Sequence, residues 1–258
     1  MIDEQTIRQN ADGVLPYRFY ITESLDSTNA EAARRALVGD AGDLVVIADG
    51  QTAGRGRLGR SFLSPMESGI YMSVLLRPSL SPEAATLLTP LAAVAAVRAI
   101  RDITGVTVGI KWVNDIVYRG RKLAGILTEG SVTAEKRLDF AVVGIGINVD
   151  TATFPDEVAA VAGALAPLMG VKVSREALIG RFLTHFHALS VRLPDTAFMD
   201  EYRAASVVLG KRVRVMTEVP YEATVVAIAD SGALAVECDG GERCEISAGE
   251  VSLRLAAP

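Results

Sequence analysis

Hydrophobic residues along this chain follow two different spacings, which predicts a protein built from both strands and helices. Short, nearly continuous apolar runs are typical of buried strands, whereas a spacing near 3.6 residues is typical of a helix with one apolar face. The runs that predict strands lie at 19–25, 43–50, 69–78 and 137–150. The predicted helices lie at 27–39, 81–105, 156–169 and 174–191, and the last of them has the clearest apolar stripe.

Short connections between strands predict how the sheet is assembled. The segments 106–120 and 121–131 are predicted to be two strands joined by a turn at Arg119–Gly120–Arg121. Strands joined by so short a turn pair antiparallel. Residues 1–18 are predicted to form a loose arm. The fold class is therefore α+β, with a central, mostly antiparallel mixed sheet flanked by helices.

The pattern changes after about residue 205. Short alternating strands follow one another there, and turn signals stand at Asp230–Ser231–Gly232 and Asp239–Gly240–Gly241. A run of short strands with tight turns is typical of a small β-barrel. We therefore predict two domains, a larger one at 1–204 and a small C-terminal barrel at 205–258.

Composition and charge narrow the class of protein. The chain has 258 residues, half of them hydrophobic, and carries a net charge of -5 with an isoelectric point of about 5.2. A protein of this charge gains little from binding phosphate backbones, so we expect no nucleic-acid partner. The N-terminus is polar, and the most apolar stretch, 84–100, contains Pro90 and Arg98. We expect a cytoplasmic protein without membrane contact, in which Cys238 and Cys244 stay reduced.

One loop is unusual in its chemistry. The segment "GQTAGRGRLGR" at 50–60 places three arginines among four glycines directly after a predicted strand. Guanidinium groups bind phosphate or carboxylate through two parallel hydrogen bonds, and glycines let backbone amides approach the same anion. The order of residues is neither that of a P-loop nor that of a dinucleotide-binding turn. The segment therefore predicts another kind of anion site, although a solvated surface loop is the simpler alternative.

Three further segments carry polar residues or glycines inside strand-like runs. "KWVND" at 111–115 flanks the single tryptophan with a lysine, an amide and a carboxylate. On a continuous strand, Lys111, Val113 and Asp115 would share one face. "RKLAGILTE" and "GIGINV" contain glycines that indicate close approach by a ligand or another backbone. A polar strand end with a core tryptophan, and bulges at the glycines, are the structural alternatives.

Taken in order, these motifs resemble those of the biotin protein ligases, the biotin–[acetyl-CoA-carboxylase] ligases. The resemblance rests on "STN" at 27–29, "GRGRLGR", "KWVND", "KLAGIL" followed by Glu129, "GIGINV" and a terminal "GEVSLR", and it spans Ser27 to Arg254. It implies a class II synthetase, biotin–lipoate ligase-like fold with a small SH3-like β-barrel at the C-terminus. One departure is Val113, which stands where the family most often has proline.

The resemblance also implies a reaction. Members of the family activate biotin with Mg-ATP to give biotinyl-5'-AMP and pyrophosphate, and then transfer biotin to one lysine of a biotin carboxyl carrier domain. The expected cofactors are ATP and Mg²⁺, and biotin is the expected substrate. The expected partners are the carrier domains of acyl-CoA or pyruvate carboxylases. In this chemistry two anions must meet, which suits positive groups placed in advance.

The resemblance further implies roles for individual residues. Lys111 and Arg57 are the expected catalytic residues, at the biotin carboxylate and the α-phosphate. The residues expected to bind biotin are Ser27, Thr28, Asn29, Gln51, Gly54, Arg55, Gly56, Arg57, Lys111 and Gly125. Those expected to bind ATP are Arg57, Arg60, Lys111, Asn114, Lys122, Asn148 and Arg254, with Asp115 as the expected ligand of Mg²⁺. For Ser27 and Thr28 the alternative role is to cap the following helix.

Other functions remain open on the sequence alone. A lipoate or octanoate ligase or transferase shares the architecture and the adenylate chemistry, but differs around the Arg/Gly loop and at the C-terminus. A biotin sensor that represses transcription needs a DNA-reading element, and the roughly twenty residues before "STN" are too few for one. A purely structural protein leaves the Arg/Gly loop unexplained. We therefore expect a ligase without repressor function, as a monomer or weak homodimer.

Overall fold

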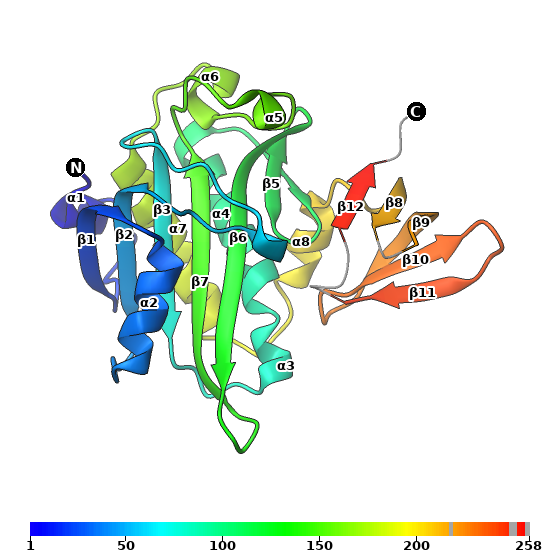
Figure 1. Cartoon of the computed structure of the whole chain (residues 1–258), viewed down its shortest axis with the longest axis horizontal. Helices are drawn as coiled ribbons and strands as arrows, with labels where there is room; N and C mark the ends of the chain where they lie inside the picture. The colour runs from blue at the N-terminus through cyan, green and yellow to red at the C-terminus, as the bar shows by residue number, and fades with distance from the viewer. Residues whose placement is uncertain (217–218, 248–251, 256–258) are drawn as a thin grey trace.

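A seven-stranded sheet forms the body of the molecule (Figure 1). The computed structural model describes residues 1–216, 219–247 and 252–255, the last four by their backbone alone. The strands of this sheet are β1 (Arg18–Leu25), β2 (Leu44–Gln51), β3 (Gly69–Leu76), β4 (Gly109–Lys111), β5 (Asp115–Tyr118), β6 (Arg121–Val132) and β7 (Leu138–Asn148). Their order is β1-β2-β3-β7-β6-β5-β4; β1 and β2 pair in parallel, and the other neighbours pair antiparallel. This confirms the predicted mixed, mostly antiparallel sheet.

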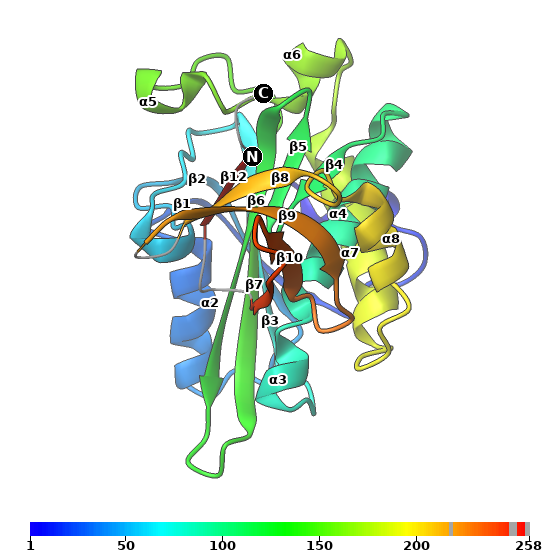
Figure 2. The same cartoon turned by 90° about the vertical axis from the view of Figure 1, so that its right-hand side faces the viewer.

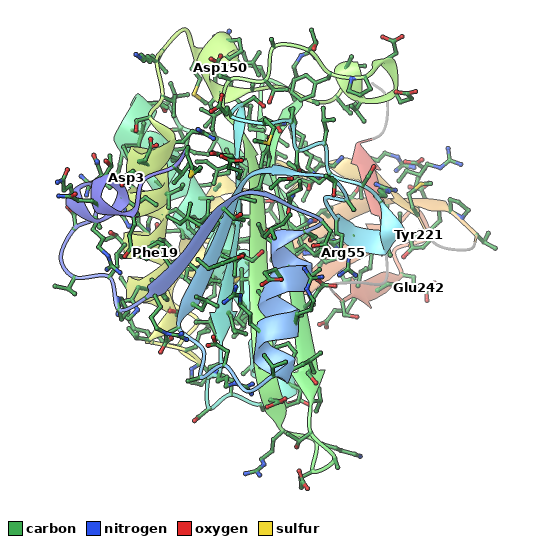
Figure 3. The ribbon with its side chains drawn as sticks, turned by 60° about the vertical axis from the view of Figure 1, so that its left-hand side comes forward. Asp3, Phe19, Arg55, Asp150, Tyr221 and Glu242 are labelled. Atoms are coloured by element: carbon green, nitrogen blue, oxygen red, sulfur yellow. The ribbon has the colours of Figure 1, made fainter. Side chains whose placement is uncertain are left out.

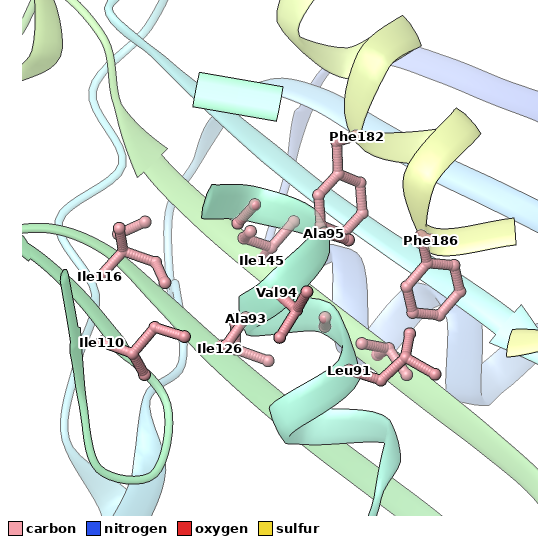
Figure 4. Packing of buried hydrophobic residues seen from close by; sticks show 14 of the residues in the cluster. Leu91, Ala93, Val94, Ala95, Ile110, Ile116, Ile126, Ile145, Phe182 and Phe186 are labelled. Atoms are coloured by element: carbon pink, nitrogen blue, oxygen red, sulfur yellow. The ribbon is translucent and has the colours of Figure 1, made fainter. Parts of the chain in front are cut away.

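Helices cover both faces of this sheet (Figure 2). They are α1 (Glu4–Gln9), α2 (Thr28–Leu37), the short η1 (Arg57–Gly59), α3 (Pro82–Ala85), α4 (Leu88–Thr104), α5 (Asp156–Ala159), α6 (Leu165–Met169), α7 (Arg175–Ser190) and α8 (Met199–Ala205). On one face, Ala32 and Ala36 of α2 close a small apolar core over β2, β3 and β7. On the other face, α4 lies between the sheet and α7 in a much larger core, which includes Leu91, Val94 and Phe182 (Figure 4).

The N-terminal segment is ordered, so the predicted loose arm at 1–18 is wrong. Asp3 caps α1 by accepting a hydrogen bond from the Thr6 amide at 2.7 Å. Ile7 is fully buried, and its carbonyl oxygen would lie 2.6 Å from a Cβ on Gly180 of α7. A few apolar side chains of this segment, together with Gly180 on α7, therefore hold α1 against α7. The polar residues around them obscured this pattern in the sequence.

Two of the predicted helices are each divided in two. The helix expected at 81–105 consists of α3 and α4, because Pro90 lacks the amide that would continue the helical hydrogen bonds through the join. The helix expected at 156–169 consists of α5 and α6, because the chain between them runs beside β6. There Lys122 donates its amide to Val161 O and accepts from Gly163 N. Pairing with a strand replaces the helical hydrogen bonds at that point.

The "KWVND" motif forms a hairpin, so the predicted continuous strand is wrong. β4 ends at Lys111, β5 begins at Asp115, and these two residues pair directly across the hairpin. They still share one face, because directly opposed residues do so, but Val113 belongs to the turn. Ile110 and Ile116 pair one step further back and are both fully buried. Burial of both isoleucines against the same core favours the hairpin.

The C-terminal module is a five-stranded antiparallel sheet, consistent with the predicted SH3-like barrel. Its strands are β8 (Arg212–Met216), β9 (Tyr221–Ile228), β10 (Leu234–Cys238), β11 (Arg243–Ile246) and β12 (Ser252–Leu255), in the order β11-β10-β9-β8-β12. It lies beside the β4–β5 end of the larger sheet (Figure 1). Ser206 forms an isolated bridge with Ile110, and Trp112 Nε1 donates to Gly232 O at 2.8 Å. The module is therefore attached to the "KWVND" hairpin.

One helical stretch in the described part of the chain, Pro82–Thr104, is long and apolar enough to cross a membrane. Of its most apolar window, 61% is buried inside the molecule, and α4 packs against both the sheet and α7. It is therefore a core helix, as predicted for this segment. Cys238 and Cys244 are free thiols on the neighbouring strands β10 and β11.

Candidate active site

The face of the sheet that carries α2 has a strip without side chains. Gly125 of β6 and Gly146 of β7 pair directly, and the row continues to Asp115 on β5 and Lys111 on β4. Opposed residues point to the same side of a sheet, so both charged residues lie beside the glycines. The Phe62 ring lies above Gly146, where its Cε1 would be 2.5 Å from a Cβ. We call Gly125 and Gly146 the glycine floor, a place where a flat group can lie directly on the strands.

The Arg/Gly loop is closed on itself by backbone hydrogen bonds. Phe62 N donates to Gly54 O at 2.9 Å, and Gly56 N donates to Arg60 O at 2.7 Å. Gly54 has to be glycine, because a Cβ there would lie 2.3 Å from the Phe62 carbonyl oxygen. Figure 3 shows Arg55 on this loop beside α2. The loop therefore presents its arginines from an ordered backbone next to the glycine floor.

Arg57 reaches from the loop to the β4–β5 hairpin. Its Nη1 donates to Asn114 Oδ1 at 3.1 Å, whereas its Nη2 is buried and has no hydrogen-bond partner among the described residues. Burial lowers the pKa of this guanidinium, and the nearby Asp115 carboxylate raises it. The group stays charged, because arginine titrates far above neutral pH. A buried, charged donor without an acceptor is costly, which indicates a place for an anionic ligand.

Lys122 holds its ammonium group above the glycine floor. Its Nζ lies 2.6 Å from Asp115 Oδ1 and 3.0 Å from the position that a Cβ on Gly125 would take. Lys111 lies in the same row on the other side of Asp115, and Arg57 is close enough to interact with the same carboxylate. One acidic residue thus has three basic neighbours. This surplus of positive charge lies beside two glycines that are covered by the Phe62 ring and the Lys122 side chain, and it suits two anionic groups held close together.

A chain of polar contacts connects α2, the sheet and the loop. It runs in order through Ser64, Gln51, Thr28, Ser73, Asn29, Glu129 and Arg55, with contact distances of 2.6 to 3.2 Å. Asn29 fits only because Gly144 faces it: a Cβ there would lie 1.9 Å from Asn29 Oδ1. The chain therefore brings together four of the residues assigned to biotin binding in the sequence, Thr28, Asn29, Gln51 and Arg55.

Four assigned residues belong neither to this chain of contacts nor to the groups described above around the glycine floor and the loop. Ser27 is the N-cap of α2, which leaves Thr28 available for the polar contacts. Arg60 is exposed. Asn148 is buried at the end of β7, where its Nδ2 donates to Gly163 O at 3.0 Å and holds the connection between α5 and α6. Arg254 lies on β12, and its side chain is outside the described residues.

Three residues of the site, Ser64, Ser73 and Phe62, were not predicted from the sequence. Ser73 is fully buried within the apolar run "GIYMSVLL", and a lone polar residue in such a run is a signal for a buried hydrogen bond. Ser64 and Phe62 follow the Arg/Gly loop, and no spacing distinguishes them from other loop residues. Only the folding of the loop onto the sheet brings them to the glycine floor.

The described side chains do not form a metal site by themselves. No group of three metal-ligating side chains occurs in residues 1–216 and 219–247. The Asp115 carboxylate is already bonded to Lys122. Mg²⁺ prefers oxygen ligands, and it commonly binds one or two carboxylates together with phosphate oxygens of a substrate. Asp115 is the carboxylate of the row beside the glycine floor, so any such ion would depend mainly on oxygen atoms of a bound nucleotide.

The fold and the arrangement of the site match those of the biotin and lipoate protein ligase class. Residues 22–148 match the Biotin/lipoate A/B protein ligase family, and residues 208–254 match the Biotin protein ligase C terminal domain. The chain is 35% identical to the biotin--[acetyl-CoA-carboxylase] ligase of Mycobacterium tuberculosis, in an alignment that covers 97% of this chain and 95% of that protein. The chain belongs to the biotin protein ligase family.

Two further relatives extend the comparison. The "Bifunctional ligase/repressor BirA" of Bacillus subtilis is 40% identical over 144 residues. That alignment covers 55% of this chain and 44% of the relative, less than half of its length. The structure of the biotin protein ligase from Aquifex aeolicus in complex with biotin and ATP has a TM-score of 0.79 and 27% identity. The structural likeness covers 93% of this chain and 99% of that chain, and so includes both the large sheet and the C-terminal module.

Proposed function

We propose that this protein joins biotin to a carrier protein in two steps that consume ATP. In the first step a carboxylate oxygen of biotin attacks the α-phosphorus of ATP, the bond to pyrophosphate breaks, and biotinyl-5'-AMP forms. In the second step the amine of an acceptor lysine attacks the acyl carbon of the adenylate, and AMP and a proton leave. The relatives named above support this reaction, and so does the distribution of charge around the glycine floor.

The observation that carries the proposal is the buried Nη2 of Arg57, which has no partner among the described residues. Two anions repel each other as they approach, and the charge at phosphorus grows in the transition state. Positive groups held ready at that point stabilise the transition state without first having to reorganise. Lys122 meets this requirement above the glycine floor, Lys111 lies in the same row, and Arg57 is close to the Asp115 carboxylate of that row. In this proposal the reactants lie in line over Gly125, next to the Phe62 ring that covers Gly146.

The polar chain is our proposed site for the ring end of biotin. Thr28, Asn29, Gln51 and Arg55 offer hydroxyl, amide and guanidinium groups, which can bond a ureido group. Gly54 and Gly56 let the loop backbone approach, and Ser27 acts through the helix it caps. For the nucleotide we propose Asn114 and Lys122 at the floor, with Arg60, Asn148 and Arg254 as outer contacts. Asp115 would hold the Mg²⁺ that accompanies ATP, whose role is to neutralise phosphate charge.

Exchange of pyrophosphate into ATP tests the first step and the identity of the acid. We expect the wild-type protein to exchange labelled pyrophosphate in the presence of biotin, and not with octanoate or lipoate. Exchange only with octanoate or lipoate would instead identify the protein as a lipoate-type ligase of the matched family. Absence of exchange with every acid, together with biotin binding, would identify a binding protein.

A methyl group on the glycine floor is expected to weaken substrate binding. In Gly125→Ala the new Cβ lies 3.0 Å from Lys122 Nζ, the far end of a flexible side chain, so the fold tolerates it. It projects into the space of the ligand, and we expect the KM for biotin to rise about tenfold. Gly130→Ala on the same strand is the matched control, because its Cβ meets nothing closer than 3.3 Å. Equal KM values for the two variants would contradict a ligand on this floor.

The remaining assignments follow from the same proposal. We propose a carrier domain of an acyl-CoA or pyruvate carboxylase as the acceptor, since the Mycobacterium tuberculosis relative is named for acetyl-CoA carboxylase. We propose a cytoplasmic protein without nucleic-acid or membrane partners, as a monomer or weak homodimer. We propose a domain boundary between residues 204 and 205, supported by the end of α8 at Ala205 and by the separate sheet that follows.

A further inference from the structure

The three residues at the tip of the β4–β5 hairpin are held from three different parts of the molecule. Trp112 Nε1 donates to Gly232 O of the C-terminal module at 2.8 Å. The Val113 carbonyl accepts from the hydroxyl of Tyr202 on α8 at 3.0 Å. Asn114 makes two hydrogen bonds with the backbone of β6, at 2.8 and 2.9 Å. The turn is therefore fixed by tertiary contacts as well as by its own sequence.

The contact from Tyr202 is suited to hold the turn permanently. The Tyr202 side chain is fully buried, and this burial raises the pKa of the phenol, so the hydroxyl stays protonated and keeps donating. Val113 is itself 2% exposed, so a carbonyl deprived of this donor would not gain water in its place. Tyr202 also lies close enough to Arg57 for the charged guanidinium to lower the pKa of the phenol, against the larger opposite effect of burial.

The position of this turn determines the position of Arg57. Asn114 follows Val113 directly, and its Oδ1 accepts from Arg57 Nη1 at 3.1 Å. The other nitrogen of the same guanidinium is the buried donor that has no partner within the described part of the chain. A small displacement of the Val113 carbonyl therefore moves Asn114, and with it the nitrogen that is to meet an anion. Small misplacements of such groups have large effects on rate.

We infer that Tyr202 is a positioning residue of the adenylation site, which holds Arg57 in place through Val113 and Asn114 and does not itself touch a substrate. The inference rests on the proposed function, since that function assigns Arg57 to the carboxylate and the α-phosphate. It also gives α8 a role in the reaction. Through Trp112, the C-terminal module is attached to the same turn.

Tyr202→Phe tests the inference, because it removes one oxygen atom and keeps the packing. We expect kcat for biotin-dependent ATP–pyrophosphate exchange to fall about tenfold, as for the loss of one hydrogen bond to a buried carbonyl. Thermal unfolding should remain a single cooperative transition. Tyr118→Phe is the matched control on β5 of the same hairpin, since its hydroxyl makes no hydrogen bond within the described part of the chain. The control should exchange at the wild-type rate.

A double-mutant cycle separates positioning from a general loss of stability. Arg57→Lys alone lowers the exchange rate, because the planar fork is lost. If Tyr202 acts through Arg57, adding Tyr202→Phe to Arg57→Lys should lower the rate little further. Both substitutions then disturb the same interaction, so their effects on the rate are not additive. Two fully additive losses would overturn the inference.

The single tryptophan provides a readout that is independent of the reaction. Trp112 is buried in the turn, so Tyr202→Phe should increase the quenching of its fluorescence by acrylamide, and Tyr118→Phe should not. Unchanged quenching in Tyr202→Phe would overturn the inference even if the exchange rate fell. If the wild-type protein shows no exchange with biotin, the proposed function fails, while the quenching result still tells whether Tyr202 holds the turn.

Discussion

Replacing Lys122 with alanine is expected to lower kcat/KM for biotin-dependent ATP–pyrophosphate exchange by roughly a thousandfold, the loss typical of a charge-stabilising group at a transition state. Lys122 Nζ lies 3.0 Å from the position of a Cβ on Gly125, directly above the glycine floor. It is also bonded to Asp115, which fixes its orientation. The measurement is the exchange rate of the purified variant at limiting and at saturating biotin and ATP.

Comparing the exchange rates of Lys122→Ala and Lys111→Ala shows which of the two lysines has the catalytic role. The sequence motif favours Lys111 as the catalytic lysine, and the structure places the ammonium group of Lys122 above the floor in the same row, so we expect both alanine variants to lose activity. Lys172→Ala, at an exposed lysine, is the control for the loss of one positive charge. If Lys111→Ala were inactive and Lys122→Ala unaffected, the catalytic role would belong to Lys111.

Arg175→Ala is expected to lower the free energy of unfolding by about 3 kcal/mol, the usual cost of leaving a buried charge without its partner. Arg175 Nη1 donates to Asp49 Oδ1 at 2.8 Å, and the Asp49 side chain is only 3% exposed. Without the guanidinium, this buried carboxylate in β2 would keep, among the described residues, only the more distant and half-exposed N-terminal ammonium group of Met1, at 3.6 Å. Urea unfolding followed by circular dichroism measures the effect, with the midpoint lowered and the slope unchanged.

The double variant Asp49→Asn with Arg175→Met is the control for this prediction. It removes both charges, so no buried ion is left, and we expect it to be more stable than Arg175→Ala alone. If Arg175→Ala changed the unfolding free energy by less than about 0.5 kcal/mol, as an ordinary surface substitution does, the pair would not be a buried ion pair in solution.

Local patterns predicted the elements that depend on local physics. The apolar runs identified β2, β3 and β7 closely, because a strand buried on both faces admits few polar residues. The start of α2 follows from Ser27, whose hydroxyl caps the helix. The segment that became α1 was missed because its burial depends on α7, which comes more than 160 residues later in the chain. The division of α3 from α4 was visible in Pro90, but a continuous apolar stripe outweighed it.

The candidate site was predicted in part. The Arg/Gly loop, the "KWVND" motif and the glycines of β6 and β7 are all recognisable in the sequence, because chemistry at an anion requires particular residue types. Their arrangement was not. The hairpin at Lys111 and Asp115 replaced a predicted strand, because pairing Ile110 with Ile116 buries both side chains in the core.

The sequence by itself determined most of the strands and helices of the large domain, which charged groups are available, and to which family the motifs point. The tertiary structure alone decided which of these groups meet. Arg57 and Asn114 are 57 positions apart, and Trp112 and Gly232 are 120 apart. No local preference connects such residues. They meet because burying both faces of one sheet leaves few ways to fold the loop, the hairpin and the C-terminal module against it.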